Sequence, residues 1–185
     1  SIAPLLFGGP LILRPVHIAL LEMVIDPVCS LAFEAEAEEP DVMRRKPRAP
    51  DSPLISRSLL AWSGLQGAAA LILLLALTAW ANFSGVGEEA IRSTGFAGLI
   101  VSVFVLVLVN RSFKGRRTEH NPALLVILGL TAGLNALVLF VPPVARLFHF
   151  TVPGRSEVVA VAVVALALAG VLTAAKGRFR AGFTR

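Results

Sequence analysis

Long stretches of apolar residues dominate the pattern of this chain. Four of them, at about 59–83, 94–112, 122–143 and 156–175, hold few charged side chains, and a fifth, at about 13–33, carries two acids in its interior. A helix needs about 20 apolar residues to cross the hydrocarbon core of a bilayer, and each stretch is near that length. The pattern therefore predicts an all-α membrane protein, a bundle of five transmembrane helices.

The composition supports a membrane protein. Hydrophobic residues make up 56% of the 185 residues, and the mean hydropathy is +0.78, whereas ordinary soluble domains contain fewer apolar residues. Cys29 is the single cysteine, which excludes an intramolecular disulfide and a thiolate metal cluster built by this chain alone. Candidate chemistry must therefore come from oxygen-bearing groups within the apolar stretches.

Lysine and arginine are distributed unevenly between the predicted helices. Of the 17 such residues, five lie in 34–58 and four lie in each of 111–121 and 176–185, which leaves four on the opposite side of the bundle. Basic loops are retained on the cytoplasmic side of membranes. We therefore expect a multi-pass protein of the cell (plasma) membrane with its N-terminus outside and its C-terminus cytoplasmic. This topology explains the isoelectric point near 10.6 without nucleic-acid binding.

The same elements divide the chain into four parts. We expect an external turn and a first helix in 1–33, a cytoplasmic loop in 34–58, a four-helix transmembrane bundle in 59–175 and a basic cytoplasmic tail in 176–185. Residues 1–12 lack the basic region of a signal peptide and contain no initiator methionine. We therefore expect the chain to be part of a longer protein in which a further membrane helix precedes it.

Two acids inside the first apolar stretch are the most informative polar residues. Glu22 and Asp26 are four residues apart, so on a helix they project from the same face. A charged side chain at mid-bilayer depth costs about 2.5–3.5 kcal/mol on insertion scales. Pro27 follows directly, has no N–H and clashes with the carbonyl of Met23. We therefore predict that the helix is kinked or unwound between about Met23 and Cys29.

A break at this place would leave a free backbone carbonyl beside two carboxylates, and oxygen ligands of this kind hold hard cations such as calcium. We predict that Glu22, Asp26 and the backbone carbonyl of Met23 bind a cation within the membrane. The alternative is structural, either an ion pair of the acids with Arg14 or His17 or packing of the protonated acids. His17 itself is expected at the outer membrane interface, with a proton-relay role as the alternative.

Amides and small residues within the helices predict packing contacts. Asn110 and Asn135 are candidates for hydrogen bonds between helices, and an ion-ligand role is the alternative for Asn135. Gly129 and Gly133 have the spacing that lets two helices approach closely. A second group of small residues comprises Gly64, Gly67 and Ala68.

The segment from Pro15 to Arg48 resembles the sixth transmembrane helix and the following cytoplasmic loop of type II P-type cation-transporting ATPases. In these calcium-pump-like proteins, an Asp-containing, locally unwound helix precedes a loop of the form P-x-x-x-D-[IV]-M-x-R-P-P-R. Residues 39–48 read E-P-D-V-M-R-R-K-P-R, with Lys46 where the first of the two prolines is usual. The resemblance extends over the chain and implies that the bundle is the C-terminal transmembrane domain, helices 6–10, of such a pump.

The resemblance also implies roles for single positions. Calcium pumps of this type place ligands in the sixth helix with the spacing Asn-x-x-Thr-Asp, which corresponds to Glu22, Ile25 and Asp26. Asp26 is kept, a carboxylate replaces the amide at Glu22, and Ile25 offers no oxygen. Residues 94–109 also lack the acid that the eighth helix supplies. These departures favour a single divalent cation, or a proton-coupled site that uses Glu22, over a two-calcium site of the animal type.

Motifs of ATP hydrolysis are absent from the sequence. It contains no D-K-T-G-T phosphorylation motif, no T-G-E motif and no Gly-rich phosphate loop. The resemblance therefore implies that ATP and magnesium act only in catalytic domains outside this chain, although the parent protein would be an ion-translocating ATPase. The implied partners are the lipid bilayer, the preceding membrane helices and those cytoplasmic domains, and nucleic acid is not among them.

Two functions remain open at this point. The first is the C-terminal membrane domain of an ATP-driven cation pump, which contributes part of a transmembrane site for calcium or another hard cation. The second is a freestanding small membrane protein or accessory subunit that uses its intramembrane carboxylates for ion or proton conduction.

Overall fold

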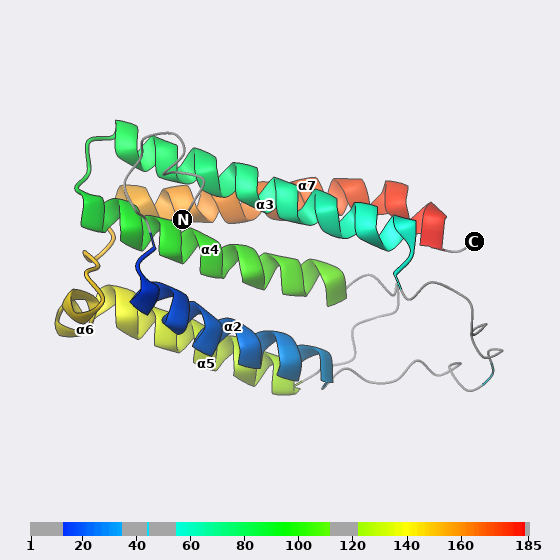
Figure 1. Ribbon diagram of the computed structural model, residues 1–185, viewed down its shortest axis with the longest axis horizontal. Coiled ribbons are helices and arrows are strands. Elements are labelled where there is room, and N and C mark those ends of the chain that lie inside the picture. The colour runs from blue at the N-terminus through cyan, green and yellow to red at the C-terminus, as the bar shows by residue number, and fades with distance from the viewer. Residues whose placement is uncertain (1–12, 35–43, 45–54, 112–121, 184–185) are drawn as a thin grey trace.

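The structure is a computed structural model that describes residues 13–34, 44, 55–111 and 122–183. Every regular element in this described part is helical. The helices, shown in Figure 1, are α2 (Pro15–Glu34), α3 (Arg57–Phe83), α4 (Glu88–Arg111), α5 (Pro122–Phe140), α6 (Pro142–Leu147) and α7 (Arg155–Phe183).

Helix α4 lies at the centre of the bundle (Figure 1). It contacts α3 and α7 on one side and α2 and α5 on the other, while α3 packs on α7 and α2 packs on α5. In the most apolar 18-residue segment of α4, half of the residues are buried. The buried share of the corresponding segment is 11% in α3 and 17% in α7. Helix α4 therefore forms the interior of the bundle, and α3 and α7 present most of their apolar surface outward.

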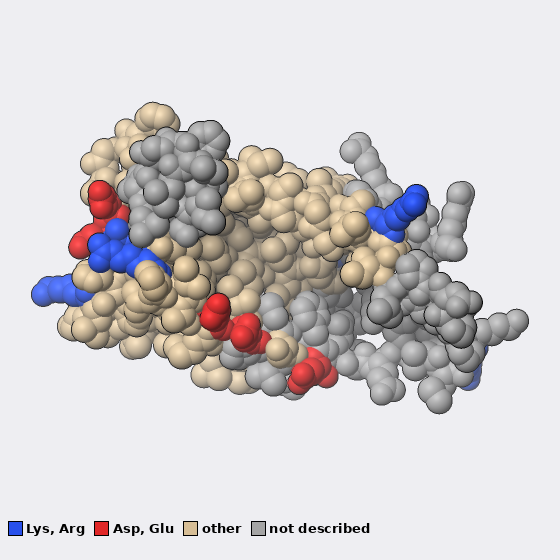
Figure 2. Space-filling view, viewed as in Figure 1, with Lys and Arg blue, Asp and Glu red and all other residues tan. Residues whose placement is uncertain are grey.

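Apolar side chains cover the outside of the bundle as well as its core. Strongly exposed examples are Leu60, Ile72, Leu130 and Leu166. Figure 2 shows a broad uncharged surface over the middle of the bundle, with acidic side chains along one side of it over α2. An apolar exterior of this extent is typical of helices that face lipid. The all-α bundle is therefore confirmed for the described residues, and its apolar exterior is the one expected of a membrane protein.

Among the residues that the structure describes, three helices are long and apolar enough to cross a membrane: Arg57–Phe83, Glu88–Asn110 and Arg155–Lys176. Leu124–Phe140 is a shorter apolar helix, and α2 holds the two acids. Each of the five predicted stretches thus contains one long helix in the described part of the chain, and three of these helices meet this standard for a membrane span. The number of crossings stays a prediction.

Helix boundaries follow local chemistry more closely than hydropathy. Helix α4 begins six residues before the apolar stretch that starts at 94, because Glu88 and Glu89 occupy its first turn, where acids interact favourably with the helix dipole. The stretch 122–143 divides at Val141, after which Pro142 starts the short helix α6. Helix α7 continues to Phe183 through most of the segment expected as a tail.

The ends of the helices fall into two groups (Figure 1). The C-terminal ends of α2, α4 and α7 lie at one end of the bundle, together with the N-terminal ends of α3 and α5. These are the ends to which the three basic segments attach. The fold thus places the three attachments on one side, as the charge pattern requires, and the orientation in the membrane stays a prediction.

The predicted unwinding at Pro27 is wrong. Helix α2 continues as one α-helix from Pro15 to Glu34. Proline removes a single N–H, and the hydrogen bonds before and after it remain available to the helix. Membrane helices tolerate such an interior proline. The carbonyl of Met23 still lacks its usual helical donor, because the donor four residues later would be the nitrogen of Pro27.

A reciprocal amide pair joins α3 to α4, and it confirms the predicted role of Asn110. Gln66 Nε2 donates to Asn110 Oδ1 at 2.7 Å, and Asn110 Nδ2 donates to Gln66 Oε1 at 3.2 Å. Trp62 Nε1 also donates to Asn110 Oδ1 at 3.3 Å. Trp62 and Gln66 are buried, so these polar groups satisfy one another inside the bundle.

We expect Asn110→Leu to destabilise the protein by about 1–2 kcal/mol, in the upper range for hydrogen bonds between membrane helices. The variant leaves the buried Gln66 amide without its Asn110 partner. The double variant Gln66→Leu/Asn110→Leu should recover most of the loss, because it removes both halves of the amide pair. Unfolding in mixed micelles measures both, and equal losses in the single and double variants would contradict the pairing.

The predicted close packing at the small residues is wrong for the described part of the chain. A Cβ added at Gly64, Gly67, Gly129 or Gly133 would meet nothing within 4 Å. The close approach occurs instead at Gly98, where a Cβ would lie 2.5 Å from Cδ2 of Leu77 on α3. The amide nitrogen of Asn135, expected to bond between helices, donates to the Thr131 carbonyl of its own helix at 2.8 Å.

Candidate cation site

The two predicted carboxylate ligands lie together on one exposed face of α2. Glu22 and Asp26 are both exposed, whereas the described side chains of this helix that are buried, those of His17, Leu20, Leu21 and Val24, lie on the opposite face. Figure 2 shows acidic side chains along the surface over α2. The acids therefore point away from α4 and α5, while the apolar face of α2 packs into the core of the bundle.

The structure does not complete a cation site from the described residues alone. In the described part of the chain, no group of three or more His, Cys, Asp and Glu side chains is placed to hold a metal ion. The chain offers two carboxylates and the carbonyl of Met23, whereas calcium takes six to eight oxygen ligands. A complete site on this face needs further oxygens from outside the described residues.

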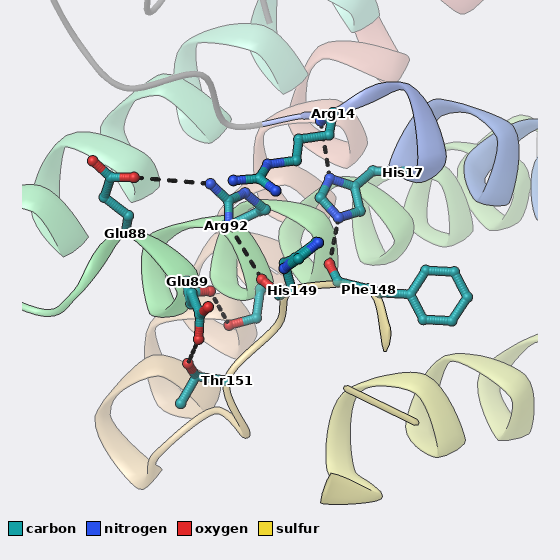
Figure 3. Close-up of polar contacts among 9 residues, drawn as sticks. Arg14, His17, Glu88, Glu89, Arg92, Phe148, His149 and Thr151 are labelled. Carbon is teal, nitrogen blue, oxygen red and sulfur yellow. Dashed lines mark hydrogen bonds and ion pairs between the residues drawn. The ribbon is translucent and has the colours of Figure 1, made fainter. Parts of the chain in front are cut away.

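The N-terminal end of α2 is anchored by His17, which lies five residues before Glu22 (Figure 3). Its side chain is 0% exposed, so it is buried against other helices, and its expected depth at the membrane interface stays a prediction. The Arg14 N–H donates to Nδ1 at 3.0 Å, and Nε2 lies 2.6 Å from the carbonyl oxygen of Phe148. Because Nδ1 accepts a hydrogen bond, Nε2 carries the proton and donates to Phe148.

Both ring nitrogens of His17 are therefore used by backbone groups, and the predicted alternative of an ion pair between His17 and the acids finds no support. The imidazole also stacks on Phe150, with ring centroids 4.7 Å apart and planes 17° apart. Phe96 lies at the side, with a centroid distance of 6.4 Å. These contacts fix the start of α2 to α4 and to the segment that follows α6.

Arg92 of α4 holds the same segment from the other side (Figure 3). Its Nη1 donates to the carbonyl oxygen of His149 at 3.2 Å, and its Nη2 lies 4.0 Å from Glu88 Oε2. His149 has a φ of 52°, a left-handed conformation that non-glycine residues rarely adopt. The Arg92 contact therefore helps to hold a turn that the sequence of the segment does not favour by itself.

A second contact between α4 and this segment lies beside it. Thr151 Oγ1 donates to Glu89 Oε2 at 3.2 Å. Four successive residues of this segment thus contact α2 or α4. Phe148 and His149 do so through their carbonyls, and Phe150 and Thr151 through their side chains. The segment therefore fixes the position of α2 along its axis relative to the central helix α4. This also fixes the positions of Glu22 and Asp26.

The sequence does not predict this anchor, because His17 and Arg92 reach the segment after α6 through its backbone carbonyls. His17 and Phe148 are separated by 131 positions, and a carbonyl acceptor leaves no residue-type signal. The available hint was Arg92, an arginine just before an apolar stretch, which is costly near a membrane unless it finds a partner.

Two comparisons with known proteins agree with this architecture. Residues 10–177 match the family model described as "Cation transporting ATPase, C-terminus". The chain is also similar to "Calcium-transporting ATPase 1" of Bacillus cereus, with 24% identity over 165 residues that cover 78% of this chain and 18% of the relative. The chain thus spans less than one fifth of the length of that relative.

Proposed function

Because the chain belongs to the family of C-terminal domains of cation-transporting ATPases, we propose that it supplies part of the transmembrane cation site of an ATP-driven pump. Glu22, Asp26 and the carbonyl of Met23 are its ligands, and the transported ion is calcium or another hard cation. The observation that carries this proposal is the outward-facing pair of acids in the middle of a largely apolar helix.

The exposure of the pair is informative because of its surroundings. Charged groups facing lipid are costly, and acids within membrane helices almost always face a protein interior or a water-filled cavity. The face that carries Glu22 and Asp26 is turned away from α4 and α5. Preceding membrane helices of the pump would cover this face and complete the oxygen shell, since a cation compensates the two negative charges.

The proposed identity of the ion rests on ligand chemistry and on the similarity of the chain to a calcium transporter. An all-oxygen set with two carboxylates suits a hard divalent cation, and the similar protein from Bacillus cereus is named as a calcium transporter. ATP and magnesium belong to the cytoplasmic catalytic domains of the parent protein, because the phosphorylation motif is absent from this chain. Those domains and the bilayer are its proposed partners.

The other candidate function is a freestanding membrane protein that conducts ions or protons through the same acids. The coding sequence upstream of Ser1 separates the two. An open reading frame that continues into a further membrane helix and a D-K-T-G-T motif supports the pump. A start codon directly before Ser1 supports the freestanding protein and contradicts the proposal.

We propose that the N-terminal end of α2 faces outward in the cell membrane and that the C-terminus is cytoplasmic. Single cysteines at Ser84 and Gly154, in a Cys29→Ser background, should react with an impermeant maleimide added to intact cells. A cysteine at Thr118 should react only after permeabilisation, because it belongs to a basic segment held inside. Labelling of position 118 in intact cells would show that the proposed orientation is wrong.

A further inference from the structure

A cavity of about 240 Å³ lies among α4, α5 and α7, away from the acids of α2. Helix α5 makes its principal contacts with α2, α4 and α6, which leaves room between α5 and α7 over the surface of α4. Most of its lining is apolar, including Ala97, Phe104, Ala136, Leu139 and Val161. It runs beside α4 from Thr94 to Phe104, a distance of about 15 Å at the rise of a helix.

One end of the cavity is polar. Thr94 is 0% exposed, and its hydroxyl has no hydrogen-bond partner within the described residues. Its neighbour Ser93 donates to the carbonyl of Glu89 at 3.0 Å, and Ser102 donates to that of Gly98 at 2.7 Å. Other hydroxyls of this helix thus bond back to the backbone, whereas Thr94 lines the cavity with its donor unused.

The carboxylate of Glu157 lies at the same end. Glu157 is buried and lines the cavity in the first turn of α7. Ser156 Oγ donates to its Oε2 at 3.1 Å, and a Cβ on Gly154 would lie 2.6 Å from that oxygen. The carboxylate is therefore held against the start of α7, with no lysine or arginine among the residues that line the cavity.

We propose that this cavity binds one membrane phospholipid with a primary ammonium headgroup, an ethanolamine phospholipid. The part of an acyl chain nearest the glycerol lies along the apolar part beside α4, because the volume falls short of a site for a whole drug-sized molecule. The Thr94 hydroxyl donates to an ester or phosphate oxygen. The ammonium donates to Glu157, because a carboxylate prefers a cationic N–H donor. A quaternary ammonium cannot donate, and an anionic headgroup is repelled.

Native mass spectrometry of the delipidated, detergent-purified protein that carries this chain tests the site. Ethanolamine, choline and glycerol phospholipids with identical acyl chains are added in turn. We expect one retained ethanolamine lipid, bound about tenfold more tightly than the other two, the ratio expected for one charge-assisted hydrogen bond. Glu157→Gln should abolish this preference, and Thr94→Val should weaken binding of all three lipids without changing their order.

Two further variants separate lipid binding from general damage. Ala136→Phe fills the cavity and should abolish retention, whereas Ala162→Phe, on an exposed position of α7 outside the lining, should retain it. Thr94→Val should leave the thermal midpoint of the lipid-free protein unchanged or raised, because it removes an unpaired buried hydroxyl.

Retention of the lipid by Ala136→Phe at the wild-type level would overturn the proposal. Preference for the glycerol lipid, or absence of any retained lipid because another helix of the protein fills the cavity, would overturn it too. These measurements do not use ATP, so their failure would leave the proposed transport function untouched.

Discussion

Replacing His17 with alanine is expected to destabilise the protein by on the order of 2–4 kcal/mol, because buried hydrogen-bonded groups and packed ring area are lost together. The variant leaves the carbonyl of Phe148 and the N–H of Arg14 without their imidazole partner and removes the ring stacked on Phe150. The measurement is the midpoint of thermal inactivation of the detergent-purified protein, or of its chemical unfolding.

His149→Gly is the matched control for this variant. It removes a histidine from the same segment but keeps the carbonyl that Arg92 contacts, and glycine adopts the left-handed conformation of this position without strain. Stability equal to or above that of the wild type is expected. An unchanged midpoint for His17→Ala would show that His17 does not anchor α2.

Hydropathy was sufficient to predict the five long helices, although not the short helix α6 or the helix boundaries. The stretches at 59–83 and 156–175 read as long apolar helices and are α3 and most of α7. The pairing of Asn110 with α3 was also predictable in kind, since a lone amide inside an apolar helix requires a partner. The partner itself, Gln66, became visible only when the two helices were placed side by side.

The failures share a physical cause. A proline lowers helix propensity, but it removes only one N–H, and α2 continues as a helix through Pro27, with Leu20, Leu21 and Val24 packed into the core before it. Small residues at the right spacing permit a close approach without requiring it, which is why Gly98 packs against α3 and Gly129 does not. Tertiary contacts decide both outcomes, and neither can be read from spacing within one helix.

The candidate site was predictable only in part. The spacing of Glu22 and Asp26 predicted that they share a face, and the structure places both on the exposed face of α2. Which side of the bundle that face would occupy depends on how α2 packs against α4 and α5. The anchor at His17 depends on the fold of the segment after α6, which hydropathy does not describe.

The largest effect on activity is expected for Asp26→Asn, measured in the complete pump. Asp26→Asn keeps the shape and one oxygen but removes the charge that binds a divalent cation. Changes that only orient a metal ligand already cost about 10–100-fold in affinity, so loss of a direct carboxylate ligand should abolish ion-dependent phosphorylation from ATP.

Glu22→Gln makes the same chemical change one helical turn away. We expect weaker apparent ion affinity, by about 10–100-fold, with phosphorylation still reached at high ion concentration. Protons compete with the cation for a carboxylate, so the wild-type affinity should fall as the pH is lowered. Without the Glu22 carboxylate this dependence on pH should become shallower.

The decisive measurement is phosphoenzyme formation from ATP as a function of calcium concentration, at two pH values, for the wild-type pump and both variants. The thermal midpoint of each detergent-purified variant serves as the control for folding. We expect Asp26→Asn to form no calcium-dependent phosphoenzyme from ATP while it keeps the thermal midpoint of the wild type measured without calcium. If Asp26→Asn shows the calcium dependence of the wild type, Asp26 is not a ligand and α2 does not carry the cation site.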